Sequence, residues 1–201
     1  MTGGIAVIGA GAFGTALACV VARRGRAVTL LGRDPGKIDA IATTRRHPAL
    51  PADAAIPENV FATADPAILD GARLVLLAVP SQSLRAAAQT YRSRIDADAD
   101  LVVCAKGLEQ TTGRFLSDVL KEEMPDHRVA ILSGPAFAAD IVHRLPTALT
   151  IAGDQAQIAE SLAKSLSGET FRLYSSTDMA GVQIGGALKN VLAIACGIVE
   201  G

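Results

Sequence analysis

The stretch IAVIGAGAFGTALA at 5–18 decides the fold of this chain. An apolar strand runs into a glycine-rich turn, and the turn runs into an apolar helix. The turn, GAGAFG at 9–14, has the GxGxxG spacing of a dinucleotide-binding loop. We expect Gly9 to make the turn, Gly11 to admit a pyrophosphate and Gly14 to let the helix pack on the strand. A tight strand–helix turn without a ligand is the alternative.

The same region is uncharged from Ile5 to Ala22, which is close to the length of a membrane span. However, no positive residue stands before it, and its glycines would interrupt the apolar core of a signal segment. We therefore expect a buried strand followed by a buried helix here, and no membrane span.

The composition is that of a compact folded protein. The chain has 201 residues, of which 50% are hydrophobic and 19% are charged, and its formal net charge is −1. This balance excludes disorder, which needs low hydrophobicity and high net charge, and it provides no positive field for nucleic acid. The cysteines and histidines are scattered without ligand spacing, so no metal site is expected.

Apolar runs alternate with helical stretches along the chain, which is typical of a parallel sheet flanked by helices. We therefore predict an α/β protein with a Rossmann-like, doubly wound, mainly parallel sheet. The predicted strands are 5–8, 27–31, 74–79, 101–105 and 129–132, with weaker ones at 148–152 and 171–174. The predicted helices are 12–24, 37–44, 81–95, 111–124, 154–166 and one from 177 or 178 onward, with another opened by 133–135. Pro146 favours an edge position for the strand 148–152.

The predicted domain boundary lies after residue 176. Residues 1–176 are expected to form a dinucleotide-binding domain, and 177–201 to form the first helix of a second, helical domain. The helical pattern continues to Gly201 without a terminating motif. We therefore expect this chain to be a fragment in which the rest of the helical domain is absent.

The end of the second predicted strand, Leu31-Gly32-Arg33-Asp34, is where a dinucleotide's adenosine ribose is recognised. An acid there binds the 2′-hydroxyl of NAD(H), whereas an arginine accommodates the 2′-phosphate of NADP(H). Arg33 has the planar fork that suits phosphate, while Asp34-Pro35 also fits the start of the next helix. The sequence favours NADP(H), and it leaves open both NAD(H) and a merely solvated Arg33.

Three further segments offer cations or amides to a ligand. Lys106 follows a predicted strand and precedes a glycine, which directs a positive charge at the crevice. Ser133-Gly134-Pro135 follows another strand, and the helix it opens would offer amides to an anion. Lys189 is a lone charge on an apolar helix face, one turn beyond Gly185 and Gly186. It is either an acid/base or a lysine that reaches solvent from the edge of the core.

Together these motifs resemble the NAD(P)-dependent glycerol-3-phosphate dehydrogenases, most closely the bacterial type. The matching stretches follow the family's order over nearly the whole chain: 5–18, 28–35, 79–81, 105–114, 133–141, 145–152 and 181–197. The resemblance implies a Rossmann-like domain, a helical domain and the interconversion of dihydroxyacetone phosphate and sn-glycerol 3-phosphate, which supplies glycerophospholipid synthesis. Members are longer than this chain, and their helical domain adds an acid and an arginine–asparagine pair that hold the substrate.

On the cofactor side, the resemblance implies that Ala12 and Phe13 line the pyrophosphate turn. Arg33 would lie beside the adenosine ribose, and Lys106 and Ala138 would contact the cofactor. Ala12 stands where the family usually has a small hydroxyl residue, so only its backbone amide is left for a hydrogen bond.

On the substrate side, the resemblance implies that Lys106, Gly134 and Ala136 line the site, with Asn190 beside a catalytic Lys189. Lys189 would protonate the ketone oxygen, and Lys106 would stabilise the negative charge that develops on it. Ala136 replaces a frequent hydroxyl residue, which leaves only its backbone for the substrate.

Two alternative functions stay open. One is a nucleotide-binding module without turnover, and the other is a related dehydrogenase of the 3-hydroxyacid or ketopantoate type. For the favoured function we expect a cytoplasmic protein with a small phosphate substrate and no nucleic-acid partner. Homodimer formation is left open.

Overall fold

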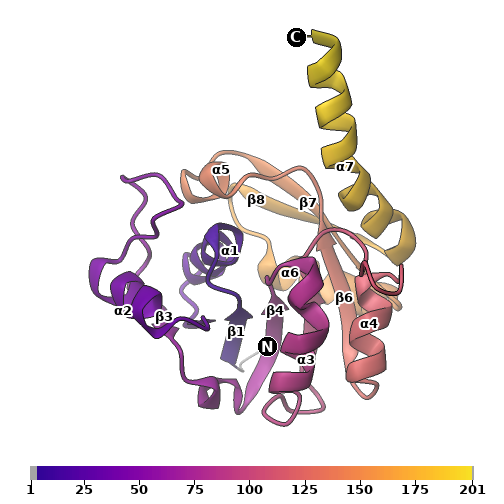
Figure 1. Cartoon of the computed structure of the whole chain (residues 1–201). Coiled ribbons are helices and arrows are strands. Elements are labelled where there is room, and N and C mark those ends of the chain that lie inside the picture. The colour runs from indigo at the N-terminus through magenta and orange to yellow at the C-terminus, as the bar shows by residue number, and fades with distance from the viewer. Residues whose placement is uncertain (1–3, 201) are drawn as a thin grey trace.

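The computed structural model describes residues 4–200, and the side chains of all of these except 190–193 and 200. They form an eight-stranded sheet with the order β3-β2-β1-β4-β5-β6-β7-β8 (Figure 1). The strands are β1 (Gly4–Ile8), β2 (Val28–Leu31), β3 (Val60–Thr63), β4 (Ala72–Leu77), β5 (Asp100–Val103), β6 (Arg128–Ser133), β7 (Thr147–Gly153) and β8 (Phe171–Ser176). The helices are α1 (Ala12–Ala22), α2 (Pro35–Thr44), α3 (Leu84–Tyr91), α4 (Leu116–Glu123), α5 (Ala138–Val142), α6 (Ala156–Leu166) and α7 (Met179–Glu200), with 3₁₀ turns η1 (Pro66–Leu69) and η2 (Ser81–Ser83).

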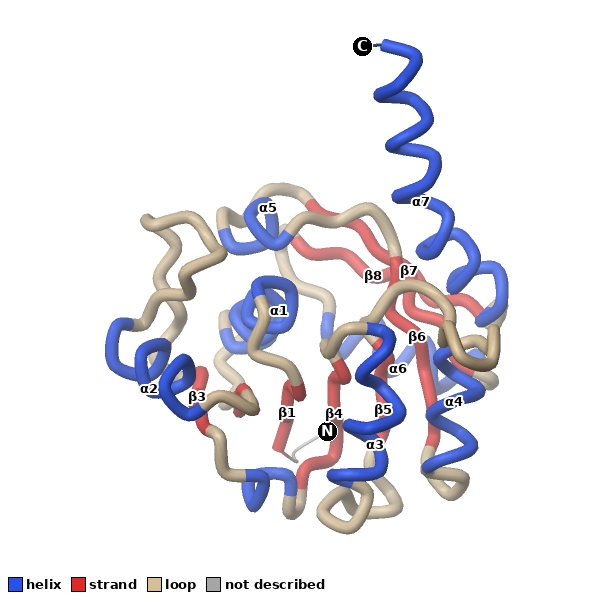
Figure 2. The backbone as a smooth tube through the Cα atoms, viewed as in Figure 1, coloured by secondary structure: helices blue, strands red, loops and turns tan. Residues whose placement is uncertain are grey.

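The strands from β1 to β6 are parallel, whereas β7 runs antiparallel to β6, and β8 runs parallel to β7. Figure 2 shows the strands in red and the helices in blue. This arrangement confirms the predicted α/β, Rossmann-like, doubly wound and mainly parallel sheet. The strand order reverses at β1, because the chain proceeds first to β2 and β3 and then returns to β4 on the other side. Ligands of such sheets bind at the carboxyl ends of the strands beside this point.

Two apolar cores cover the two faces of the sheet. Ile5 and Val7 of β1 face the core that includes α1 and part of α6, whereas Ala6 and Ile8 face the core that includes α3 and α4. A strand buried on both faces reads as a continuous apolar run. The uncharged segment from Ile5 to Ala22 therefore folds, as predicted, into a buried strand and a buried helix.

The sheet corrects two strand assignments. The sequence pattern does not predict β3, since its four residues, VFAT, show no alternation and follow a proline-rich loop. They become a strand by pairing with β2. The prediction of an edge position for 148–152 is wrong, because β7 lies between β6 and β8 and Pro146 stands just outside it.

Two predicted helix starts are also wrong. The helix α4 begins at Leu116 rather than Thr111, because the residues before it form a loop in which Gly113 has φ +71. The helix α5 begins at Ala138 and has only five residues. Ser133-Gly134-Pro135 therefore leads into a loop instead of the predicted anion-binding helix start.

The last helix, α7, begins against the sheet and ends away from it (Figure 1). Its first part packs on β6 and β7, whereas Ile194 and Ile198 are 65% and 75% exposed. By length and composition alone, Met179–Val199 would be long and apolar enough to cross a membrane.

Candidate functional site

The glycine turn joins β1 to α1 where the strand order reverses. Gly9 has φ +115, and a Cβ there would lie 2.5 Å from the carbonyl oxygen of Ala78, just after β4. A Cβ on Gly14 would overlap the carbonyl oxygen of Gly9, whereas the Cβ side of Gly11 is open. The first and third glycines thus close the turn, and the second leaves room at its surface for a phosphate.

A cavity of about 1060 Å³ opens over this turn. It runs along the carboxyl ends of β1, β2, β4 and β5 and is bounded by the start of α2 and by α3. Its lining includes eight of the predicted site residues: Gly9, Gly11, Ala12, Phe13, Arg33, Lys106, Ala136 and Ala138. The volume is at the upper end of the range of small-molecule sites, which suits an extended dinucleotide.

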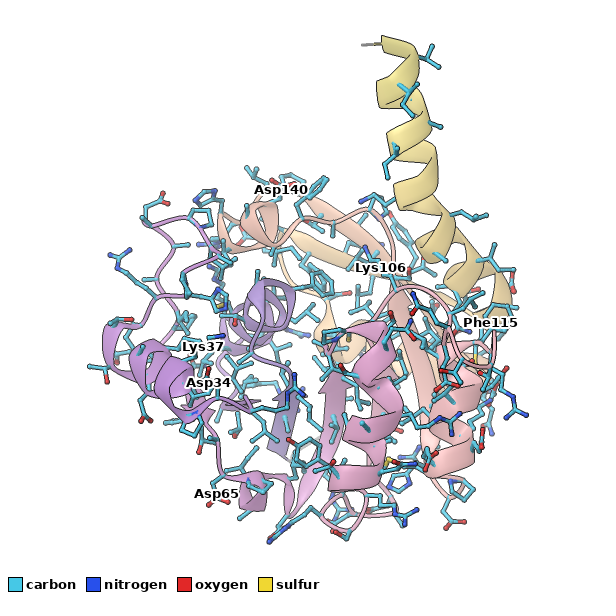
Figure 3. The ribbon with its side chains drawn as sticks, in the orientation of Figure 1. Asp34, Lys37, Asp65, Lys106, Phe115 and Asp140 are labelled. Atoms are coloured by element: carbon cyan, nitrogen blue, oxygen red, sulfur yellow. The ribbon has the colours of Figure 1, made fainter. Side chains whose placement is uncertain are left out.

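Arg33, Asp34 and Lys37 line the end of this cavity where β2 stops and α2 begins. Figure 3 shows Asp34 and Lys37 together there. Asp34 caps the helix, because its Oδ1 accepts a hydrogen bond from Lys37 N at 3.2 Å and Pro35 occupies the first turn. The capping role that the sequence indicates for Asp34-Pro35 is confirmed.

Lys106 lines the other end of the cavity, on the opposite side of α1 from Lys37 (Figure 3). Its ammonium donates a hydrogen bond to the carbonyl oxygen of Gly134 at 2.8 Å and lies 5.7 Å from the centre of the Phe13 ring. Burial, and then the positive charge of Lys189, lower the pKa of Lys106. A half-buried cation with a lowered pKa is typical of functional sites.

A second cavity, of about 420 Å³, lies where α7 crosses β6, and Ser133, Gly134 and Lys189 line it. Lys189 is half-buried, and its ammonium lies 4.6 Å from the centre of the Phe137 ring. Phe137 belongs to the lining of the first cavity, whereas Gly134 belongs to the second and holds Lys106. Both lysines therefore lie near the place where the two cavities adjoin.

Two residues hold α7 against its neighbours, Gln183 against α4 and Gly186 against β6. The buried amide of Gln183 accepts a hydrogen bond from Ser117 N at 3.1 Å and donates one to Ser117 Oγ at 2.9 Å. One turn later, a Cβ on Gly186 would overlap Ser133 Oγ, so glycine lets α7 approach β6 closely. Lys189 lies a further turn along the helix, in the lining of the second cavity.

Comparison with known proteins identifies the family to which this chain belongs. The family profile for the NAD-dependent glycerol-3-phosphate dehydrogenase N-terminus matches residues 4–159, and the profile for the C-terminus matches 178–201. The chain belongs to this family. A glycerol-3-phosphate dehydrogenase, NAD(P)+, from Rhizobium etli is 56% identical over 98% of this chain and 61% of the relative. A glycerol-3-phosphate dehydrogenase structure from Coxiella burnetii has a TM-score of 0.91 at 34% identity, over 98% of this chain and 61% of that one.

The chain thus spans 61% of the length of these glycerol-3-phosphate dehydrogenases. The resemblance of the sequence motifs to this family is confirmed, and so is the Rossmann-like fold.

The predicted site residues of this chain divide between the two cavities. Gly134 and Lys189 line the smaller cavity, whereas Ala136 lies with the glycine turn in the larger one. Gly14 packs beneath the turn, and the side chain of Asn190 lies outside the described residues. Among residues 4–200 with described side chains, no three His, Cys, Asp or Glu residues are arranged to hold a metal ion. The chemical roles of the site residues remain predictions.

One residue that supports the turn carries no sequence signal. His47 Nε2 lies 3.1 Å from the carbonyl oxygen of Ala10, inside the glycine turn. Since His47 Nδ1 accepts a hydrogen bond from Ala49 N at 3.1 Å, we assign the proton to Nε2, which donates to the turn. A lone histidine in a proline-rich loop gives no indication of this contact.

An ion pair that the motifs also do not predict holds the loop between β5 and α4. Arg85 donates from Nε and Nη2 to the two carboxylate oxygens of Glu109 at 2.8 and 3.0 Å. Thr112 Oγ1 donates to the same carboxylate at 2.6 Å, and Gln82 makes two hydrogen bonds to the loop backbone. This loop begins directly after the strand end that carries Lys106, so the pair helps to hold that lysine in place.

The Arg85–Glu109 pair makes stability depend on acid pH. Hydrogen bonds from Arg85, and then from Thr112, lower the pKa of Glu109 to about 2, from an ordinary value of about 4.3. Because the folded-state pKa is lowered, the carboxylate's contribution is present above the unfolded-state pKa and is lost as the pH falls towards 2. We expect Glu109→Gln to lower the urea midpoint clearly at pH 7 and much less at pH 2.5.

Glu169→Gln is the matched control for this measurement, since Glu169 is 81% exposed and its partner Arg144 is 60% exposed. Such a surface pair contributes little, so the control is expected to match the parent at both pH values. A Glu109→Gln deficit of equal size at pH 7 and pH 2.5 would contradict the ion-pair explanation.

Proposed function

We propose that this chain binds NADP(H), with NAD(H) as the second choice, in the larger cavity. The glycine turn supports the proposal, because Gly9 and Gly14 leave no room for a Cβ where the turn closes, whereas Gly11 is open at its surface. Arg33 at the adenosine end supports the preference for a 2′-phosphate. The other proposed cofactor contacts are Ala12, Phe13, Lys106 and Ala138.

We also propose that the chain is the nucleotide-binding part of an oxidoreductase that interconverts dihydroxyacetone phosphate and sn-glycerol 3-phosphate. The observation that carries this proposal is that Lys106, which donates a hydrogen bond to Gly134, and Lys189, which lines the smaller cavity with Gly134, both lie where the two cavities adjoin. The nicotinamide cofactor supplies the hydride for the ketone carbon when it is bound. Lys189 gives a proton to the ketone oxygen, and Lys106 stabilises negative charge on it.

The proposal extends to the substrate side and to the organisation of the chain. Gly134, Ala136 and Asn190 are proposed to contact the phosphate substrate beside the two lysines. Residues 1–176 form the dinucleotide-binding domain, and 177–201 begin the helical substrate domain. We propose that the whole protein is cytoplasmic and that its product supplies glycerophospholipid synthesis. It has no nucleic-acid partner, and it is either a monomer or a homodimer.

Calorimetric titration of this chain with NADPH and with NADH tests the cofactor proposal. We expect one molecule of NADPH to bind per chain, with higher affinity than NADH. Absence of binding for both would refute the proposal. Binding of a cofactor by a chain that shows no turnover of dihydroxyacetone phosphate, even when joined to a helical domain, would favour the nucleotide-binding module instead.

A further inference from the structure

The adenosine end of the larger cavity holds a second cation beside Arg33. We propose that Lys37 binds the cofactor's 2′-phosphate together with Arg33, and that this pair selects NADP(H) over NAD(H). The proposal rests on the proposed function, because it needs the larger cavity to hold a dinucleotide. It adds a specificity-determining residue that none of the sequence motifs identifies.

Glycine, not an acidic residue, stands at the position just after β2 where a carboxylate would recognise the ribose. Gly32 directly follows β2, and a Cβ there would lie 2.7 Å from Ile38 Cγ1 and 3.0 Å from the Cβ of Ala10. A longer side chain at this position would have to displace the buried Ile38 side chain. The 2′-hydroxyl of NAD(H) therefore meets no carboxylate directly at the end of β2.

The neighbouring carboxylate, Asp34, is engaged by the helix that follows. Its Oδ1 accepts the hydrogen bond from Lys37 N at 3.2 Å, and its Oδ2 lies 3.6 Å from Lys37 Nζ. Turning this carboxylate towards a ribose would remove the cap of α2. Asp34 instead holds the Lys37 ammonium near the rim of the cavity.

The two cations fit a phosphate better than they fit a hydroxyl group. Arg33 and Lys37 both line the cavity and are exposed, and within residues 4–200 no hydrogen bond or ion pair engages the Arg33 side chain. A phosphate monoester carries close to two negative charges and three acceptor oxygens. It can take the planar fork of Arg33 and the ammonium of Lys37 together, whereas a ribose hydroxyl gains little from a second cation.

Titration of this chain with four probes tests the pair: NADPH, NADH, adenosine 2′,5′-bisphosphate and adenosine 5′-diphosphate. We expect Lys37→Ala to weaken NADPH and the 2′,5′-bisphosphate about 3- to 10-fold, the range for one exposed charge-assisted hydrogen bond. NADH and the 5′-diphosphate should change by less than about twofold, because they carry no 2′-phosphate. Raising the salt concentration should reduce the preference for the 2′-phosphate probes.

Lys164→Ala is the matched control, because this lysine lies on α6, outside the lining of both cavities. It is expected to leave all four affinities unchanged. Lys37→Glu is a second variant that keeps an exposed, helix-compatible residue, and it should weaken the 2′-phosphate probes more than Lys37→Ala does. Thermal unfolding of each variant establishes that its binding site is folded.

Equal losses for NADPH and NADH, or no loss for either, would overturn the role of Lys37. The parent chain could also bind the 2′,5′-bisphosphate in a Lys37-dependent way and bind neither dinucleotide. That result would support the anion site at Lys37 and would refute the proposed function. Asp34→Asn adds an independent check. It should leave NADH affinity unchanged, whereas a selective loss of NADH would show that Asp34 recognises the ribose and would contradict the proposal.

Discussion

Gly14→Ala is expected to abolish NADPH binding and to destabilise the chain by about 3 kcal/mol or more. The added methyl group would overlap the carbonyl oxygen of Gly9, which is backbone and cannot rotate away. Relief of this overlap requires α1 to move off β1, and the turn would open. Since folded domains are stable by only about 5–15 kcal/mol, the change is measurable as a large fall in the urea midpoint.

Gly11→Ala separates binding from folding in the same turn. Apart from the adjacent residues and the backbone of its own helix, no atom lies within 4 Å of the position of a Cβ at Gly11. The free energy of unfolding, measured by urea titration, should therefore change by less than about 0.5 kcal/mol. NADPH affinity should nevertheless fall at least about tenfold, because the methyl group stands where the pyrophosphate approaches the backbone. A Gly11→Ala chain that binds NADPH as tightly as the parent would locate the cofactor away from the turn.

Lys189→Ala is expected to lower kcat about 100- to 10,000-fold, the usual contribution of a general acid or base. The NADPH dissociation constant should stay within about twofold, because Lys189 lines only the smaller cavity. The measurement uses this chain joined to the C-terminal part of the Rhizobium etli relative, since the chain spans 61% of that protein. NADPH oxidation is followed with dihydroxyacetone phosphate as the substrate.

Lys189→Arg and Lys164→Ala accompany this measurement. Arginine keeps the positive charge but does not give up its proton near neutral pH, so Lys189→Arg should be nearly as inactive as Lys189→Ala. Lys164→Ala removes a lysine outside both cavities and should retain the parent's kcat. Turnover close to the parent's in either Lys189 variant would restrict that residue to packing and would remove its assigned role in proton transfer.

The glycine turn could be predicted from the sequence because its contacts involve a short stretch of chain and one neighbouring strand. Gly14 faces Gly9 five positions earlier, and Gly9 faces the residue that follows β4. Apolar runs buried on both faces of the sheet are similarly visible as composition. By contrast, β3 is too short and too irregular for such a signal, and it forms a strand only because β2 offers an open edge.

The sequence by itself determined the doubly wound sheet, the turn over which a dinucleotide fits, and three candidate cations, Arg33, Lys106 and Lys189. These depend on apolar periodicity and on glycines at set spacings, which are local properties. Only the tertiary structure decided which of these cations lie near one another. Lys189 lies near Lys106 because Gln183 holds α7 against α4 and Gly186 lets it approach β6 closely. Arg33 and Lys37 are close in sequence, but they line the larger cavity because the start of α2 packs at its edge. How whole elements pack against one another cannot be read from residue spacing along the chain.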